Sequence, residues 1–329
     1  MKSSTKMMMC IILVMSTLLV MSSNNWISMW MGLEMNLMSF IPTIFESKNN
    51  KISQSCMMYF MAQSMGSITF LATILMKKYV ENMDSSFIYN VIMVSMAIKL
   101  GAPPFHLWLL MMMEKISWLN CLLMMTWQKL APMYIMSIVA QETMTQLLVI
   151  MSSMTGAIMA INQTSTRSIM AYSTMTHMSW MFISMKTSDK MWLTYFCMYT
   201  LMVTFTTMYF MHMNVLYVSQ ASIFSMKLSE KINFILMMMS MGGLPPFFGF
   251  LPKWIIISEM IESKEMFIMM FVLFMNLIPL FYYIRLCTPL NMFLCQTQKW
   301  QTPKKSLIPK YILITNMLMT PMILTLSFF

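Results

Sequence analysis

The run Gly101-Ala-Pro-Pro-Phe105 recurs as Gly243-Leu-Pro-Pro-Phe247, and each copy lies inside a long apolar segment. Proline has no backbone N–H and its ring crowds the carbonyl four residues earlier, so a Pro-Pro pair interrupts a helix. The first pair frees the carbonyls of Lys99 and Leu100, and the second frees those of the two residues before Gly243. Because unpaired carbonyls are costly in hydrocarbon, both breaks are expected to line a hydrated cavity near the middle of a membrane.

The composition around these runs is that of a membrane protein. Of 329 residues, 58% are hydrophobic and only 10% are charged, and the mean hydropathy is +0.67. Soluble globular domains carry about 25% charged residues. A soluble fold this poor in charge would expose large apolar patches, and so apolar a chain would not stay disordered. The sequence therefore predicts an all-α, polytopic membrane protein.

The apolar residues form eleven segments of roughly the length that crosses a bilayer. They run over 7–22, 26–45, 54–76, 87–112, 119–139, 145–161, 168–185, 190–212, 231–258, 265–288 and 309–328. The loops between them are short, which predicts one membrane domain over 1–329. The seventh segment is rich in Ser and Thr, so it is expected to face protein rather than lipid.

The two Pro-Pro runs fall in the fourth and ninth segments, which are five segments apart. An odd separation means that the two helices cross the bilayer in opposite directions, the signature of an inverted repeat. We therefore expect two inverted five-helix repeats, each with a Pro-broken helix, over about 7–139 and 145–288. A C-terminal helix over 309–328 would follow. Two unrelated kinks used only for packing are the alternative.

The net charge of +10 has two possible readings. In a soluble protein it would suggest nucleic acid as a partner, which the membrane composition argues against. In an eleven-span chain, 13 of the 21 Lys and Arg residues fall in loops on the side of the N-terminus, and five fall on the opposite side. The positive-inside rule then places the N-terminus in the cytoplasm or matrix and the C-terminus across the membrane.

Cofactor and metal motifs are absent from the sequence. The six cysteines are scattered with no C-x-x-C pair, and the seven glycines form neither a phosphate loop nor a dinucleotide fingerprint. The 54 methionines lie inside the apolar runs, where they fit packing and mutational bias better than a copper site. We expect neither a cofactor nor a metal in this chain.

Four ionisable residues lie inside the predicted spans: Glu34, Lys99, Lys129 and Lys253. A charge at the bilayer centre costs about 2.5–3.5 kcal/mol on the mild insertion scale. One acid cannot neutralise three bases, so buried ion pairs that merely fix helix register explain the set poorly. A proton or ion pathway explains it better, with a separable Glu34–Lys99 pair acting as a proton switch.

Two histidines are weaker candidates for the same pathway. His106 follows the first Pro-Pro run, and His177 lies in the polar seventh segment. Histidine titrates near neutral pH, which suits proton transfer. A hydrogen-bonded packing role is about as common for a single histidine in a membrane.

Several longer runs resemble a known family, the antiporter-like membrane-arm subunits of respiratory complex I, and within it subunit 2 of mitochondrial NADH dehydrogenase. The similar runs are WMGLEMNLMSFIP (30–42), KLGAPPFHLW (99–108), MTWQKLAP (125–132), NQTSTRSIMAYSTMTH (162–177) and GGLPPFFGFLPKW (242–254). They lie in the first 285 residues or so. The last 40 are recognisable only by hydropathy. Bacterial relatives often carry Lys where this chain has Arg167 or Ser168, so no proton-carrying role is assigned there.

The resemblance implies a function in proton translocation across the inner mitochondrial membrane, coupled to electron transfer from NADH to ubiquinone. It implies that Glu34 and Lys99 form the family's acid–lysine pair, that Lys129 is its central lysine and that Lys253 is the lysine of the second repeat. It implies no redox centre in this chain, lipid contacts, and neighbours of the subunit 4 and subunit 4L type. The N-terminus would lie in the matrix and the C-terminus in the intermembrane space. An Mrp-type cation/proton antiporter and a non-conducting scaffold that relays charge remain alternatives.

Overall fold

The computed structural model describes residues 3–45, 49–79, 85–187, 191–223, 228–245 and 247–292. These residues form helices and one isolated β-bridge, between Ser165 and Tyr217. They divide into two compact units, one before and one after the peptide bond between Met151 and Ser152. The predicted C-terminal helix over 309–328 lies outside the described residues, as do Pro246 and both termini.

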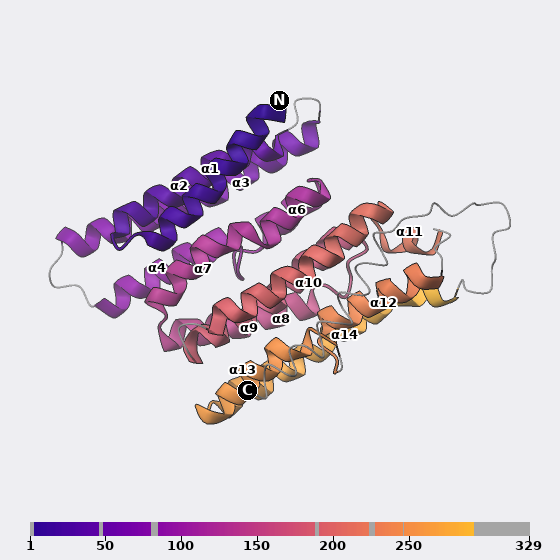
Figure 1. Cartoon of the computed structure of the whole chain (residues 1–329). Helices are drawn as coiled ribbons and strands as arrows, with labels where there is room; N and C mark the ends of the chain where they lie inside the picture. The colour runs from indigo at the N-terminus through magenta and orange to yellow at the C-terminus, as the bar shows by residue number, and fades with distance from the viewer. Residues whose placement is uncertain are drawn as a thin grey trace. The chain divides into compact units, whose positions relative to one another are not determined.

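The first unit is built on antiparallel neighbours, shown in indigo to magenta in Figure 1. Helix α2 packs on α1 and on α3, and α4 packs on α3 and on α7. Its helices are α1 (Ser3–Ser22), α2 (Trp26–Ile44), α3 (Asn50–Tyr79), α4 (Ser85–Leu100), α5 (Leu107–Met113), α6 (Trp118–Met125) and α7 (Trp127–Val139). At Gly32 the backbones of α1 and α2 approach closely, because a Cβ there would lie 3.1 Å from the carbonyl oxygen of Ser16.

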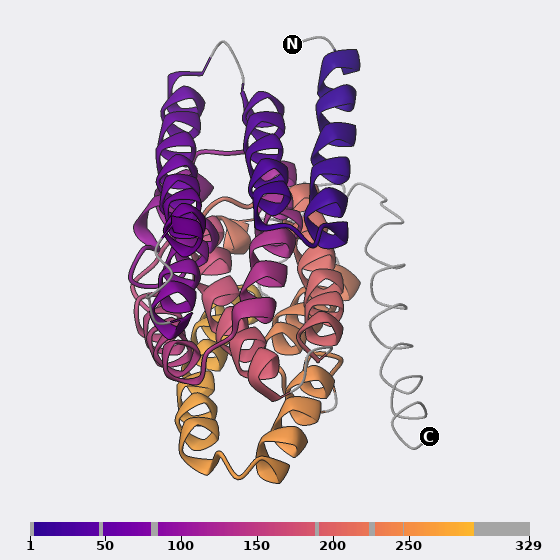
Figure 2. The same cartoon turned by 90° about the vertical axis from the view of Figure 1, so that its left-hand side faces the viewer.

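The second unit surrounds a buried polar helix. The unit boundary falls within α8 (Glu142–Ile158), and the remaining helices are α9 (Thr166–Thr187), α10 (Met191–Met213), α11 (Val218–Ile223), α12 (Leu228–Gly242), α13 (Phe250–Glu262) and α14 (Met266–Met292). Helices α10, α13 and α14 pack against α9, and a short turn joins α13 to α14 (Figure 2). Every residue of α9 from Ser168 to Met185 is buried. The expectation that this Ser- and Thr-rich segment faces protein is therefore confirmed.

Two differences from the expected helices are corrections. The segment 119–139 is not one helix but two, because α6 ends at Met125 and α7 begins at Trp127, with Thr126 between them. The N–H and the hydroxyl of Thr126 both donate to the carbonyl of Leu122, at 3.0 Å and 2.7 Å. The expected loop over 213–230 contains the short helix α11.

Membrane-spanning capacity is clearest for three of the described helices. The segments Ser4–Ser22, Asn50–Tyr79 and Met266–Thr288 are each long and apolar enough to cross a bilayer without a break. The number of spans and the inverted relation of the repeats stay predictions.

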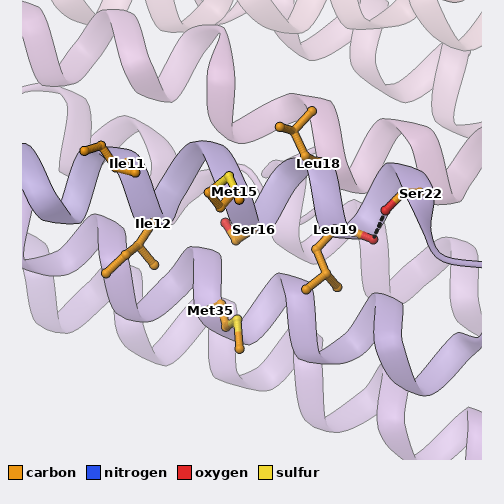
Figure 3. A pocket seen from close by; sticks show the side chains of 8 residues that line it. All are labelled: Ile11, Ile12, Met15, Ser16, Leu18, Leu19, Ser22 and Met35. Carbon is orange, nitrogen blue, oxygen red and sulfur yellow. Dashed lines mark hydrogen bonds between the residues drawn. The ribbon is translucent and has the colours of Figure 1, made fainter.

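The outward surface of α1 and α2 carries a groove of about 380 Å³. Figure 3 shows its lining, which is aliphatic and methionine side chains from Ile11 to Met35 with two serines, one of them bonded to its own helix at Leu19. No titratable side chain lines this groove. The proton chemistry expected of the chain must therefore be sought elsewhere, at the helix breaks.

Candidate functional site

The first break follows Leu100, the last residue of α4. Gly101 adopts a left-handed conformation with φ of +67°, which residues with a Cβ rarely adopt. The N–H of Gly101 donates to the carbonyl of Ile98 at 3.2 Å, and the N–H of Ala102 donates to that of Ala97 at 2.9 Å. This pair of bonds is a Schellman ending, which satisfies two of the last carbonyls of a helix.

The second break repeats this backbone. Gly243 has φ of +76°, its N–H donates to the carbonyl of Ser240 at 3.1 Å, and the N–H of Leu244 reaches that of Met239 at 3.4 Å. The N–H of Phe247 then donates to the carbonyl of Leu244 at 2.8 Å, and the matching bond in the first copy, from Phe105 to Ala102, measures 2.9 Å. The shared Gly-x-Pro-Pro-Phe sequence thus gives the same hydrogen bonds at both helix ends.

Lys99 is buried beside the first break, with 4% of its surface exposed. Its carbonyl, freed by Pro103, accepts a hydrogen bond from the Gln63 amide of α3 at 2.9 Å. Its side chain lies against Gly66 of the same helix, where a Cβ would come within 2.6 Å of the Lys99 Cγ. Helix α3 therefore holds both the backbone and the side chain of Lys99.

Glu34 lies half-buried on α2 and interacts electrostatically with Lys99. The two groups do not form a direct ion pair. In the described part of the chain the one close ion pair joins Lys186 and Glu265. The pairing of Glu34 with Lys99 as a separable proton switch stays a prediction.

Lys253 is buried in the first turn of α13, with 4% of its surface exposed. Its ammonium donates to the carbonyl of Gly242 at 2.8 Å and to Oδ1 of Asn276 on α14 at 3.0 Å. Gly242 is the last residue of α12, so the lysine after the break holds the helix end before it. Its side chain also lies over Gly243, where a Cβ would be 2.7 Å from Nζ.

Lys129 lies three residues after the unpredicted break at Thr126, and 2% of its surface is exposed. The preceding residue, Gln128 of α7, forms hydrogen bonds with residues of two other helices. Its amide donates to Oδ1 of Asn36 on α2 at 3.1 Å, and its carbonyl oxygen accepts from the hydroxyl of Tyr59 on α3 at 3.2 Å. All three buried lysines therefore lie within one turn of a helix terminus.

The two histidines occupy different surroundings. His106 lies in the loop after the first break and its Nδ1 is 3.2 Å from the carbonyl oxygen of Pro104, a contact within the loop. His177 is buried in α9, and its Nδ1 is 2.9 Å from the hydroxyl of Tyr195. Its ring also contacts that of Tyr199, at 5.1 Å between centroids. Of the two, His177 is the one built into a polar core.

Two polar residues near the lysines were missed by the sequence reasoning: Gln63 and Asn276. Each is an amide in an otherwise apolar helix, a rarity that could have marked it, because polar groups in a membrane need a partner. Polar side chains reach two of the freed carbonyls, Gln63 that of Lys99 and Lys253 that of Gly242. The hydrated cavity at each break stays a prediction. No group of three or more His, Cys, Asp or Glu side chains that could hold a metal occurs among the described residues.

Comparisons with known proteins agree with this architecture. Residues 23–279 match the family model described as NADH:quinone oxidoreductase/Mrp antiporter, transmembrane. The chain is 35% identical to NADH-ubiquinone oxidoreductase chain 2 of Anopheles gambiae, over 98% of this chain and 99% of the relative. It is 38% identical to the protein of that name from Locusta migratoria, over 92% and 90%.

Two solved structures share the fold. A chain of respiratory complex I from Thermus thermophilus aligns with a TM-score of 0.82 at 16% identity, over 95% of this chain and 76% of that one. A chain of the Mrp complex from Dietzia aligns with a TM-score of 0.71 at 13% identity, over 91% and 62%.

Proposed function

The chain belongs to the NADH:quinone oxidoreductase/Mrp antiporter transmembrane family and, within it, to the NADH-ubiquinone oxidoreductase chain 2 proteins, and from this premise we propose that protons move through it by way of Glu34, Lys99, Lys129 and Lys253. It is an antiporter-like subunit of respiratory complex I that contributes to proton translocation. Electron transfer from NADH to ubiquinone takes place in other chains. We propose the mitochondrial inner membrane as its location, with the N-terminus in the matrix.

The observation that carries the proposal is the placement of three buried lysines at three helix breaks. The C-terminal end of a helix offers carbonyl oxygens that stabilise a cation without a carboxylate. Lys99 lies at the C-terminal end of α4, and Lys253 reaches the C-terminal end of α12 through the carbonyl of Gly242. A lysine there can hold a proton inside the membrane and can also release it. Glu34 adds a charge that favours the protonated form of Lys99 whenever the two approach.

The partners belong to the same proposal. A neighbouring antiporter-like subunit of the subunit 4 type and a small subunit of the 4L type would flank this chain in the membrane arm. Lipid would cover apolar surfaces such as the groove on α1 and α2.

A second candidate function, a scaffold that relays charge without conducting protons, has one observation in its favour. Lys253 is held by two neutral acceptors, as a purely structural clamp would be. An Mrp-type antiporter fits less well, because this chain spans 62% of the Mrp chain but 99% of the Anopheles chain 2.

The test is NADH-driven proton pumping by the assembled complex in vesicles. We expect Glu34→Gln and Lys99→Met each to reduce the proton yield per electron strongly, because either change removes one half of the switch. The double variant should be little worse than the worse single variant, since both act on one element. A wild-type proton yield in both single variants would leave the scaffold as the better account.

A further inference from the structure

Asn276 is the polar residue that the mechanism above does not use. It lies in α14 within the apolar run Phe271-Val-Leu-Phe-Met-Asn-Leu-Ile-Pro279, and it accepts a hydrogen bond from Lys253 at 3.0 Å. An amide in such a helix is costly unless its hydrogen bonds are made. Because its described hydrogen bond is with Lys253, the role of Asn276 is to be sought in what it does for that lysine.

Among the described residues, two acceptors bind the Lys253 ammonium: the carbonyl of Gly242 and Oδ1 of Asn276. A charged lysine has three N–H donors, and the neutral amine that remains after loss of one proton has two. Both described bonds can therefore be kept in either protonation state. The third proton is the one that can leave without moving the side chain.

The surroundings of Asn276 supply a polar surface beyond the lysine. A narrow gap in this unit, too small to admit a water molecule, separates Asn276 from Ser153 of α8 and from Thr176 and Ser179 of α9, and its other lining residues are Trp180, Val272 and Met275. Those two α9 hydroxyls donate to carbonyls of their own helix, at 2.8 Å and 2.6 Å, which leaves their oxygen lone pairs able to accept. The amide thus stands between the lysine and the polar face of α9.

The charged and titratable groups near Lys253 are few. Helices α9, α10 and α14 pack against α13. Their buried titratable side chains are Tyr172, His177, Tyr195, Tyr199, Tyr209, Tyr282, Tyr283 and Cys287. Their charged or less buried residues are Arg167 in the first turn of α9, Lys186 and His212 in the last turns of α9 and α10, and Arg285 within α14, and α13 itself carries Glu259 and Glu262. None of these side chains forms an ion pair or a hydrogen bond with the Lys253 ammonium in the described part of the chain. The Asn276 amide is the side chain that contacts the ammonium, so it can influence how readily Lys253 gives up its proton.

We propose that Asn276 is a positioning residue, a neutral acceptor that holds Lys253 at the second break in both protonation states so that the lysine can release a proton toward α9. This inference rests on the proposed function, in which Lys253 carries a proton. A carboxylate in the same place would bind the ammonium too firmly, and an aliphatic side chain would leave the protonated lysine with one acceptor.

The experiment measures NADH-driven proton pumping of the assembled complex as a function of pH in two nearly isosteric variants. For Asn276→Asp we expect the alkaline limb of the profile to move to higher pH by about one unit or more, because a carboxylate favours the protonated lysine. For Asn276→Leu we expect a shift to lower pH, because one acceptor of the protonated form is gone. Asn276→Gln keeps a neutral acceptor and should restore the wild-type midpoint even if the rate falls.

A matched control is Asn233→Asp and Asn233→Leu. Asn233 is a buried amide of the same unit, about 13 Å along α12 from Gly242, and neither change should move the profile. Shifts of Asn276→Asp and Asn276→Leu in the same direction, or no shift in either, would overturn the positioning role. If Asn276→Asp does not assemble, an Asn276→Leu profile that matches that of Asn276→Gln would overturn it equally.

The variant Lys253→Met distinguishes a failure of this inference from a failure of the proposed function. Loss of pumping in Lys253→Met, together with unmoved Asn276 profiles, overturns the inference and leaves the function standing. Normal pumping in Lys253→Met overturns the proton-carrying role of Lys253 and the inference with it.

Discussion

The break after α4 and the break after α12 begin with the same helix ending, but their lysines are held by different means. At the first break, Gln63 holds the freed carbonyl of Lys99, and Glu34 supplies a charge from another helix. At the second, Lys253 itself holds the carbonyl of Gly242, and Asn276 supplies a neutral oxygen. At the first break, different residues bind the freed carbonyl and supply the charge. At the second break, one lysine both binds the freed carbonyl and carries the charge.

The glycines near the breaks give the largest expected contrast. A Cβ at Gly249, which follows the second break, would lie 1.7 Å from the backbone oxygen of Ser240, whereas a Cβ at Gly66 would meet the flexible side chain of Lys99 at 2.6 Å. A backbone carbonyl cannot move aside as a side chain can. We expect Gly249→Ala to destabilise the complex by more than about 3 kcal/mol, beyond ordinary overpacking. We expect Gly66→Ala to cause a smaller loss of stability and mainly to reduce proton pumping.

The measurement for the glycine pair is the yield and thermal stability of the assembled complex. Equal losses from Gly66→Ala and Gly249→Ala would contradict the contrast drawn here.

Removal of the two lysines should separate the two breaks next. Lys253→Met leaves the carbonyl of Gly242 without its described partner, which costs about 1–3 kcal/mol, whereas in Lys99→Met the backbone bond from Gln63 remains. We expect both variants to lose pumping and only Lys253→Met to lose thermal stability as well. The melting temperatures of the two assembled variants check this prediction. A lower melting temperature for Lys99→Met than for Lys253→Met would contradict it.

The amide of Gln63 provides a milder test of the first break. Gln63→Leu keeps the volume of the side chain and removes the donor to the Lys99 carbonyl. We expect a loss of about 1–3 kcal/mol in stability, because the carbonyl stays buried and unpaired, with the charge interaction of Glu34 intact. Gln54→Leu, at an exposed position of the same helix α3, is a control for the same change in side chain. A melting temperature unchanged by Gln63→Leu would show that the carbonyl has another partner.

The smallest expected effect concerns the bonds that join α2, α3 and α7. Tyr59→Phe removes one hydroxyl that donates to Gln128 and keeps the ring contact with Phe40, at 5.2 Å between centroids. We expect a loss of about 0.5–1.5 kcal/mol and near-normal pumping. A large loss of pumping in this variant would mean that the hydroxyl itself belongs to the proton pathway of the first unit.

The sequence was sufficient for the features that depend on neighbours along the chain. Proline removes a donor and glycine admits a positive φ whatever the tertiary fold, so both breaks could be placed from Gly-x-Pro-Pro-Phe alone. The burial of α9 was likewise foreseeable, because a Ser- and Thr-rich segment is poorly suited to face lipid. The lysines stood out because a charge inside an apolar run is rare.

Only the tertiary structure decided which groups hold those lysines. Gln63 lies 36 residues from Lys99, Asn276 lies 23 residues from Lys253, and Gln128 lies 92 residues from Asn36. Such pairs depend on which helices pack together and on how each is rotated, and neither is encoded in a local pattern. The same reason explains why Glu34 reaches Lys99 through space rather than by direct contact, and why the break at Thr126, which has no Pro-Pro pair to mark it, was found only in the fold.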